Sequence, residues 1–170
     1  MDTIEAIFTR RSIRAYTDRP VGEDLIELLL RAAMAAPSAG NQQPWQFVVV
    51  DDRATLDAIP AYHPYSAMLR GAPVAVVVCG DGGKEGLGAY WPQDCSAATE
   101  NLLLAAHARG LGAVWLGVYP EADRIARTRE LLGLPEAITP FCIVAIGYPA
   151  ERPGPADRYD PARVHRNRWG

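Results

Sequence analysis

Residues 73–80 read PVAVVVCG, a continuous apolar run with the length of one β-strand. A strand with one solvent-exposed face would alternate apolar and polar residues, because successive side chains point to opposite faces of a sheet. This run has no such alternation, so it predicts a strand that is covered on both faces. A strand of this kind is typical of a layered fold built from a sheet and helices.

The sequence on either side of this run predicts further strands and helices. Strand patterns occupy residues 45–51, 112–119 and 138–149, and helix patterns occupy residues 3–10, 21–37, 53–60, 93–109 and 121–134. We therefore expect one layered α+β or α/β domain with about four strands. The tail from Pro149 to Gly170 is rich in proline, which excludes a long helix or a central strand there.

The composition excludes several classes of function. The chain has 170 residues, of which 49% are apolar, and its net charge of -3 favours neither a nucleic acid nor a membrane as partner. The N-terminus lacks the pattern of a signal peptide, and the longest apolar run is too short to span a bilayer. The three cysteines have no metal-ligand spacing, and their odd number indicates the reducing cytoplasm.

The sequence RRSIR at residues 10–14 is the first candidate binding site. If the first helix ends near Arg10, the next residues are extended, and Arg10, Ser12 and Arg14 share one face. Two guanidinium groups beside a hydroxyl suit a phosphate, because arginine can bond two of its oxygens at once. Taken alone, the stretch also has the pattern of a solvated polar turn, with Arg11 and Ile13 on its other face.

The sequence PSAGNQQPW at residues 37–45 is the second candidate. It concentrates Ser38, Asn41, Gln42 and Gln43 in a stiff loop between a helix and a strand. Amide side chains present a donor and an acceptor side by side, which is what the edge of a heterocycle such as a flavin pyrimidine requires. Ordinary solvation of a loop would favour the same residues.

Residues 93–109 form the most regular helix pattern, with apolar residues on nearly all sides, which indicates a central or interface helix. Asp94 and Asn101 would form one polar stripe on it, although Asp94 also suits the start of a helix. The three histidines are far apart, and phosphate-loop and nucleophile-elbow motifs are absent from the sequence. The chain thus offers binding groups without an evident nucleophile, base or metal site, as expected when a cofactor performs the chemistry.

Four motifs in this order resemble the nitroreductase family of FMN-dependent oxidoreductases. They are RRSIRAY at 10–16, AAMAAPSAGNQQPWQFVVV at 32–50, GLGAVWLG at 110–117 and VHRNRW at 164–169. The resemblance implies an α+β fold with a central, mostly antiparallel sheet of four to five strands flanked by helices. It also implies a homodimer with two FMN sites, in which residues 1–150 form the FMN-binding domain and residues 151–170 extend onto the partner subunit.

The same resemblance implies a set of cofactor-binding residues. These are Arg10, Arg11, Ser12, Arg14, Pro37, Ser38, Ala39, Asn41, Gln43, Leu116, Gly117, Arg166 and Arg168. Arg10 and Ser12 would hold the phosphate, and Arg14 would face the flavin ring as its electrostatic partner. The loop 37–43 would approach from the other subunit, the Leu116–Gly117 backbone would lie beside the ring, and the two tail arginines would close on the phosphate.

Two positions depart from the family pattern. Some larger members have Asn and Lys in the stretch that here contains Tyr65 and Met68, and some have an acidic residue where this chain has Leu116. Both departures leave the contacts to nicotinamide and substrate open.

The function that the resemblance implies is hydride transfer from NADH or NADPH through FMN to an electron-poor small molecule. A nitroaromatic, a quinone or an enone would serve as acceptor, with ping-pong kinetics and without a catalytic side chain. One alternative is other chemistry on the same fold, such as dehalogenation or flavin breakdown, and another is a flavin-binding protein without activity.

The alternative chemistries would depend on a lid, which we expect within residues 60–92. Its aromatic residues are Tyr62, Tyr65, Tyr90 and Trp91. They would suit a planar acceptor, but they could equally pack under a long loop. The acidic charge balance argues against RNA as a partner of the basic tail.

Overall fold

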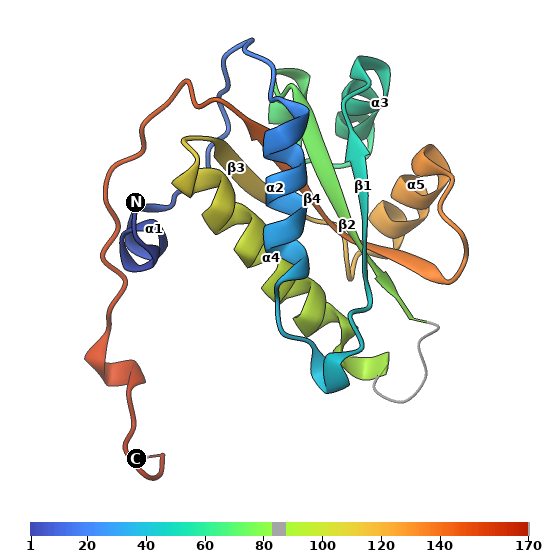
Figure 1. The fold of residues 1–170 in the computed structure, drawn as a ribbon. Coiled ribbons are helices and arrows are strands. Elements are labelled where there is room, and N and C mark those ends of the chain that lie inside the picture. The colour runs from blue at the N-terminus through green and yellow to red at the C-terminus, as the bar shows by residue number, and fades with distance from the viewer. Residues whose placement is uncertain (83–87, 170) are drawn as a thin grey trace.

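The sheet expected around residues 73–80 is present, and its strands are all antiparallel. The computed structural model describes residues 1–82 and 88–169. Its strands are β1 (Trp45–Val50), β2 (Val74–Asp81), β3 (Gly112–Gly117) and β4 (Ile138–Gly147), in the order β1-β2-β4-β3. The fold is therefore α+β, and its four antiparallel strands agree with the mostly antiparallel sheet of four to five strands that the family resemblance implies (Figure 1).

β2 lies inside the sheet and is buried along nearly its whole length. Its residue Val76 pairs with Val49 of β1 and with Val144 of β4. Val76 belongs to the core on one face of the sheet, whereas the next residue, Val77, belongs to the core on the other face. The two cores explain why the run PVAVVVCG has no polar position, since side chains on both faces are removed from water.

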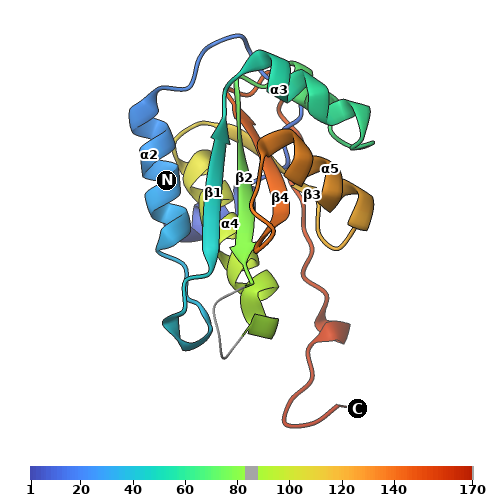
Figure 2. The same ribbon diagram turned by 90° about the vertical axis from the view of Figure 1, so that its right-hand side faces the viewer.

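Helices cover both faces of this sheet. They are α1 (Thr3–Thr9), α2 (Glu23–Met34), α3 (Arg53–Ala58), α4 (Trp91–Ala108) and α5 (Ala122–Leu132). α2 and α4 pack on one face, and α3 and α5 pack on the other (Figure 2). α2 was expected to continue to Pro37 but ends at Met34, because Ala35 already has a non-helical backbone and a proline disfavours the helical conformation before it. In the described part of the chain, no helix is long and apolar enough to cross a membrane.

α4 is the central helix that its sequence pattern predicts. It packs against α1, α2 and the sheet, and most of its side chains are buried or half-buried. The Asp94 carboxylate accepts a hydrogen bond from the backbone N–H of Ala39 at 3.0 Å, and the Asn101 amide donates one to the Ala32 carbonyl at 3.1 Å. The predicted polar stripe therefore exists, and it ties α4 to α2 and to the loop after α2.

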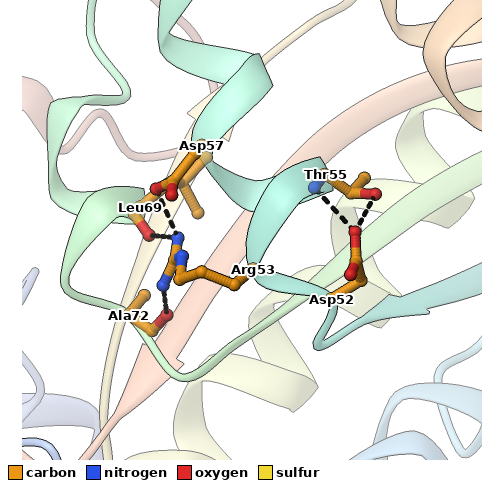
Figure 3. A network of polar contacts seen from close by, with 6 residues as sticks. All are labelled: Asp52, Arg53, Thr55, Asp57, Leu69 and Ala72. Carbon is orange, nitrogen blue, oxygen red and sulfur yellow. Dashed lines mark hydrogen bonds and ion pairs between the residues drawn. The ribbon is translucent and has the colours of Figure 1, made fainter.

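The connection between α3 and β2 is irregular, but hydrogen bonds tie it to the rest of the molecule. It contains two 3-10 turns, Ile59–Ala61 and Ala67–Arg70. Arg53, the first residue of α3, donates hydrogen bonds to the carbonyls of Leu69 and Ala72 and forms an ion pair one turn along its own helix (Figure 3). Arg53 thus anchors this part of the expected lid to α3.

The tail after β4 is extended and exposed, as its prolines predict. Pro149 forms an isolated bridge with Tyr16, and beyond it the chain leaves the sheet and passes α1 (Figure 1). Three large side chains of the tail point into solvent. Tyr159 is 76% exposed, Val164 is 56% exposed and Trp169 is 86% exposed. A single chain therefore leaves the apolar groups of its tail uncovered.

Candidate functional site

A cavity of about 500 Å³ lies beside the end of β3. Arg14, Leu116 and Gly117, which come from two distant parts of the sequence, all line it. The rest of its wall is largely aromatic and apolar, and consists of His63, Pro64, Tyr65, Ala67, Met68 and Trp115. The structure thus brings together three of the residues that the family resemblance selects, at a cavity of a size that suits a small ligand.

Arg14 reaches this cavity because the RRSIR stretch runs along the edge of the sheet. Ser12 forms a parallel bridge with Ala113, and the Ile13 N–H donates to the Ala113 carbonyl at 3.0 Å. Ile13 is buried and lies so close to β3 that a Cβ atom at Gly112 would be only 2.6 Å from it. The predicted extended conformation is confirmed, and it leaves Arg14 exposed.

The three arginines of the motif have different surroundings. Arg10 forms an ion pair with Glu100 of α4 at 3.5 Å. The Arg11 guanidinium donates to three backbone carbonyls, those of Phe8, Arg10 and Gly154. Across residues 1–82 and 88–169, the Arg14 guanidinium has no hydrogen bond or ion pair. Arg14 is therefore the arginine that remains free for a ligand at the cavity, whereas the single chain places Arg10 and Arg11 along other hollows.

The backbone at Gly117 has free space at its Cβ position and two hydrogen bonds at its carbonyl. Among the described residues, no atom lies within 4 Å of the Cβ position of Gly117. Its carbonyl accepts hydrogen bonds from His63 Nε2 at 2.9 Å and from Arg124 Nη1 at 3.1 Å. Packing within the chain does not require a glycine here, so the free space suits a ligand that approaches the backbone closely.

His63 is a residue of this site that sequence reasoning missed. Among the described residues, no group of three or more His, Cys, Asp or Glu side chains could hold a metal ion. The side chain is 1% exposed, and burial lowers the pKa of its imidazole, so the neutral form is favoured. Its partner Gly117 is 54 residues away in sequence, and no local pattern signals that contact.

The loop 37–43 lies at the start of α4, and none of its residues lines the cavity of its own chain. The Ser38 hydroxyl accepts a hydrogen bond from the Gln43 backbone, and the Asn41 side chain accepts one from the Gln43 amide. Asn41 and Gln43 have φ values of 53° and 50°, in the left-handed region that is unfavourable for residues with a side chain. Such strained backbone is frequent at binding sites.

Arg166 and Arg168, near the end of the tail, do not line the cavity of their own chain either. Both arginines are exposed. A single chain therefore places the two groups of basic residues, at its start and at its end, in different regions.

The aromatic residues of the expected lid divide into two groups. Tyr62 donates or accepts a hydrogen bond with Thr128 at 3.1 Å, and Trp91 packs edge-on against Tyr119 at 4.9 Å, so these two are packed into the structure. Tyr65 and Tyr90 are 70% and 50% exposed, and Tyr65 lines the cavity. Residues 83–87 of the expected lid lie outside the described residues.

Comparison with known proteins identifies the fold and its relatives. The model of the Nitroreductase family matches residues 7–63 and 58–148. A protein of Methanothermobacter thermautotrophicus, provisionally named an NADH dehydrogenase/NAD(P)H nitroreductase, is 53% identical over 99% of this chain and 88% of its own length. An FMN-dependent nitroreductase of Clostridium difficile has a TM-score of 0.90 and 31% identity, covering 98% of this chain and 99% of its own. A provisionally named nitroreductase of Desulfovibrio desulfuricans, solved in complex with FMN, has a TM-score of 0.85 and 33% identity, covering 100% and 99%.

Proposed function

The chain belongs to the nitroreductase family of oxidoreductases, and on this premise we propose that it is an FMN-dependent enzyme that transfers hydride from NADH or NADPH to an electron-poor small molecule. Nitroaromatics, quinones and enones are the acceptor classes that we expect. The observation that carries the proposal is that Arg14, Leu116 and Gly117 line one open cavity.

The residues at the cavity fit a flavin. The wall presents apolar and aromatic groups to a planar ring, and Gly117 leaves its backbone accessible. The free guanidinium of Arg14 can bind the polar edge of the ring and stabilise negative charge that develops there. FMN, when bound, supplies the hydride-accepting and hydride-donating centre, which is why the chain itself needs no nucleophile or metal.

The phosphate of FMN requires further positive charge. Arg10 and Ser12 belong to the same extended stretch as Arg14 and are the nearest candidates along the chain. The ion pair of Arg10 involves its Nε, so its terminal nitrogens remain available to a phosphate. Arg11 would contribute through its backbone and by fixing the tail at Gly154.

We propose further that two copies of the chain complete each site. The cavity lining of a single chain includes neither the loop residues nor the tail residues that the family resemblance selects, which are Pro37, Ser38, Ala39, Asn41, Gln43, Arg166 and Arg168. A partner subunit would supply them. The exposed side chains of Tyr159, Val164 and Trp169 support this arrangement, because isolated chains rarely expose several large apolar groups on one extended segment.

The side chains that line the cavity would each have a simple role during turnover. Trp115, Leu116 and Met68 would exclude water from a bound flavin ring, and Arg14 would stabilise negative charge on that ring. Tyr65 stands at the open side, where a planar reductant or acceptor would stack. The nicotinamide reductant and the acceptor would use the same open side of the cavity. The oxidised nicotinamide must therefore leave before the acceptor enters, which gives ping-pong kinetics.

The test is spectroscopic and uses the purified protein. We expect it to bind FMN, to lose the flavin absorbance when mixed anaerobically with NADH or NADPH in a stopped-flow instrument, and to regain it with an acceptor. A protein that takes up no FMN would refute the proposal. FMN that neither nicotinamide reduces would point to dehalogenation or flavin breakdown, and reduction without turnover of any acceptor would point to a non-catalytic protein.

A further inference from the structure

The geometry points to His63 as a positioning residue of the proposed flavin site, which holds the Gly117 carbonyl so that the Gly117 N–H faces the cavity. This inference rests on the proposed function. It concerns a side chain that acts through the backbone of another residue.

The first step is the direction of the Gly117 carbonyl. β3 is an edge strand, and its neighbour in the sheet is β4. The Val118 N–H donates to the Phe141 carbonyl of the β4 strand at 3.1 Å. Since a trans peptide is planar, the Gly117 carbonyl of the same peptide unit points away from β4, to the outer edge of the sheet. There it meets His63 and Arg124.

The second step is the direction of the Gly117 N–H. In an extended residue, the N–H and the carbonyl point to the same side of the strand. The N–H of Gly117 is therefore also directed to the outer edge, where Gly117 lines the cavity and its Cβ position faces free space. A backbone donor fixed in this way can bind a ligand without first reorganising.

The third step is the rigidity of His63 itself. Its backbone N–H donates to the Ile59 carbonyl at 3.0 Å, and its carbonyl accepts from the buried Ser66 hydroxyl at 2.8 Å. Arg53 fixes the end of the same segment at Leu69 (Figure 3). The donor that reaches Gly117 is thus built into a well-anchored turn.

The protonation state fits this role. A hydrogen bond to a carbonyl requires a proton on Nε2, and Nδ1 has no partner in the described structure. Burial lowers the pKa of the imidazole, and the nearby Arg124 lowers it further, so the neutral form with the proton on Nε2 is favoured. Arg124 also lies over the ring of Tyr65, with its Cζ 5.5 Å from the ring centroid, which connects this donor pair to the open side of the cavity.

The test compares variants of the FMN-loaded enzyme. Asn in place of His63 puts its amide near the position of Nδ1, so it does not reach Gly117, whereas Gln can place a donor near the position of Nε2. Loss of the donor should disfavour the more negative, reduced flavin. We expect His63→Asn to raise the ratio of the dissociation constants of reduced and oxidised FMN roughly tenfold, which lowers the two-electron potential by about 30 mV. His63→Gln should stay close to the wild type.

The matched control is Tyr62→Phe, which removes a hydrogen bond to Thr128 from the neighbouring position of the same turn without touching Gly117. It should leave the potential unchanged. An unchanged potential in His63→Asn, or an equal shift in Tyr62→Phe, would overturn the inference. If His63→Asn does not fold, a potential in His63→Gln that differs by as much as 30 mV would overturn it, and one within a few millivolts of the wild type would support it. A wild-type protein that binds no FMN would instead refute the proposed function.

Discussion

Glu151, at the start of the tail, accepts a hydrogen bond from the backbone N–H of Arg14. The same carboxylate oxygen accepts a second hydrogen bond from the N–H of Ala15 at 3.1 Å. Ala150 donates in turn to the Ala15 carbonyl at 2.9 Å. The backbone that carries Arg14 and the point where the tail leaves the sheet are therefore one structural unit, which links the cavity to the segment that is proposed to reach the partner subunit.

This unit predicts a stability effect of Glu151. Hydrogen bonds to a charged group are stronger than neutral ones, so Glu151→Ala should reduce the free energy of unfolding by about 1–2 kcal/mol. Glu151→Gln keeps an acceptor and should lose about half as much. Urea denaturation measures both. Glu136→Ala, at an exposed position in the loop before β4, is the control, and an equal loss there would contradict the role of Glu151.

Replacement of Arg14 should affect turnover more than binding. Its guanidinium is free and lines the cavity, so it is available to stabilise charge on the ring. We expect Arg14→Ala to slow flavin reduction about tenfold or more, equivalent to roughly 1.4 kcal/mol of barrier, while the affinity for FMN falls only a few-fold. Stopped-flow reduction and FMN titration separate the two effects.

The control for that experiment is Arg31→Ala, which removes an exposed arginine paired with Glu27 on the surface of α2. It should leave both quantities unchanged. The contrary result is that Arg14→Ala releases FMN while the remaining bound fraction is reduced at the wild-type rate. That result would show that Arg14 contributes to the affinity for FMN and not to the stabilisation of charge on the flavin ring.

The elements that could be predicted from sequence are those encoded locally. The strand at 73–80 follows from an uninterrupted apolar run, and α4 follows from a long helical pattern. Both are predictable because an element that is buried on several sides needs apolar residues at nearly every position. The ends of elements were less accurate, as at Met34, because backbone capping decides them.

The candidate site was predictable where one stretch of chain forms it. The extended RRSIR stretch and the Leu116–Gly117 backbone follow from local motifs and a family resemblance. His63 and Glu151 were not predictable, because their hydrogen-bond partners lie 54 and 137 residues away in the sequence. No local sequence pattern around either residue indicates these contacts. These contacts form only in the folded chain, where the turn that carries His63 meets β3 and the tail meets the extended N-terminal stretch.

The exposed tail predicts dimerisation that depends on residues 156–170. Deletion of these residues removes Tyr159, Val164 and Trp169 and should convert a dimer into a monomer in light scattering. Because binding of a partner adds stability by mass action, the melting temperature of the full chain should rise with its concentration, and that of the shortened chain should not. Trp169→Ala should weaken the dimer less than the deletion. A full chain that is monomeric at all concentrations would contradict the exchange of tails.

The cysteines should be inert until the protein unfolds. Cys79, Cys95 and Cys142 are free and buried, and burial raises the pKa of Cys79 and Cys95 to about 12. The reactive species is the thiolate, so a thiol reagent at pH 8 should label the protein in urea but leave the native state unlabelled. Rapid labelling of the native protein would show that one of these thiols is accessible.

The same thiols predict how stability depends on alkaline pH. The ordinary pKa of a cysteine is 9.0, so above pH 9 the unfolded chain loses protons that the folded chain keeps. Their contribution to stability is fully present below pH 9 and is lost as the pH rises towards 12, by up to about 1.4 kcal/mol per pH unit for each thiol. Cys95→Ala removes one of the three and should make this decline less steep. An unchanged slope of unfolding free energy between pH 9 and 11 would mean that the Cys95 thiol ionises as easily in the folded protein as in the unfolded chain.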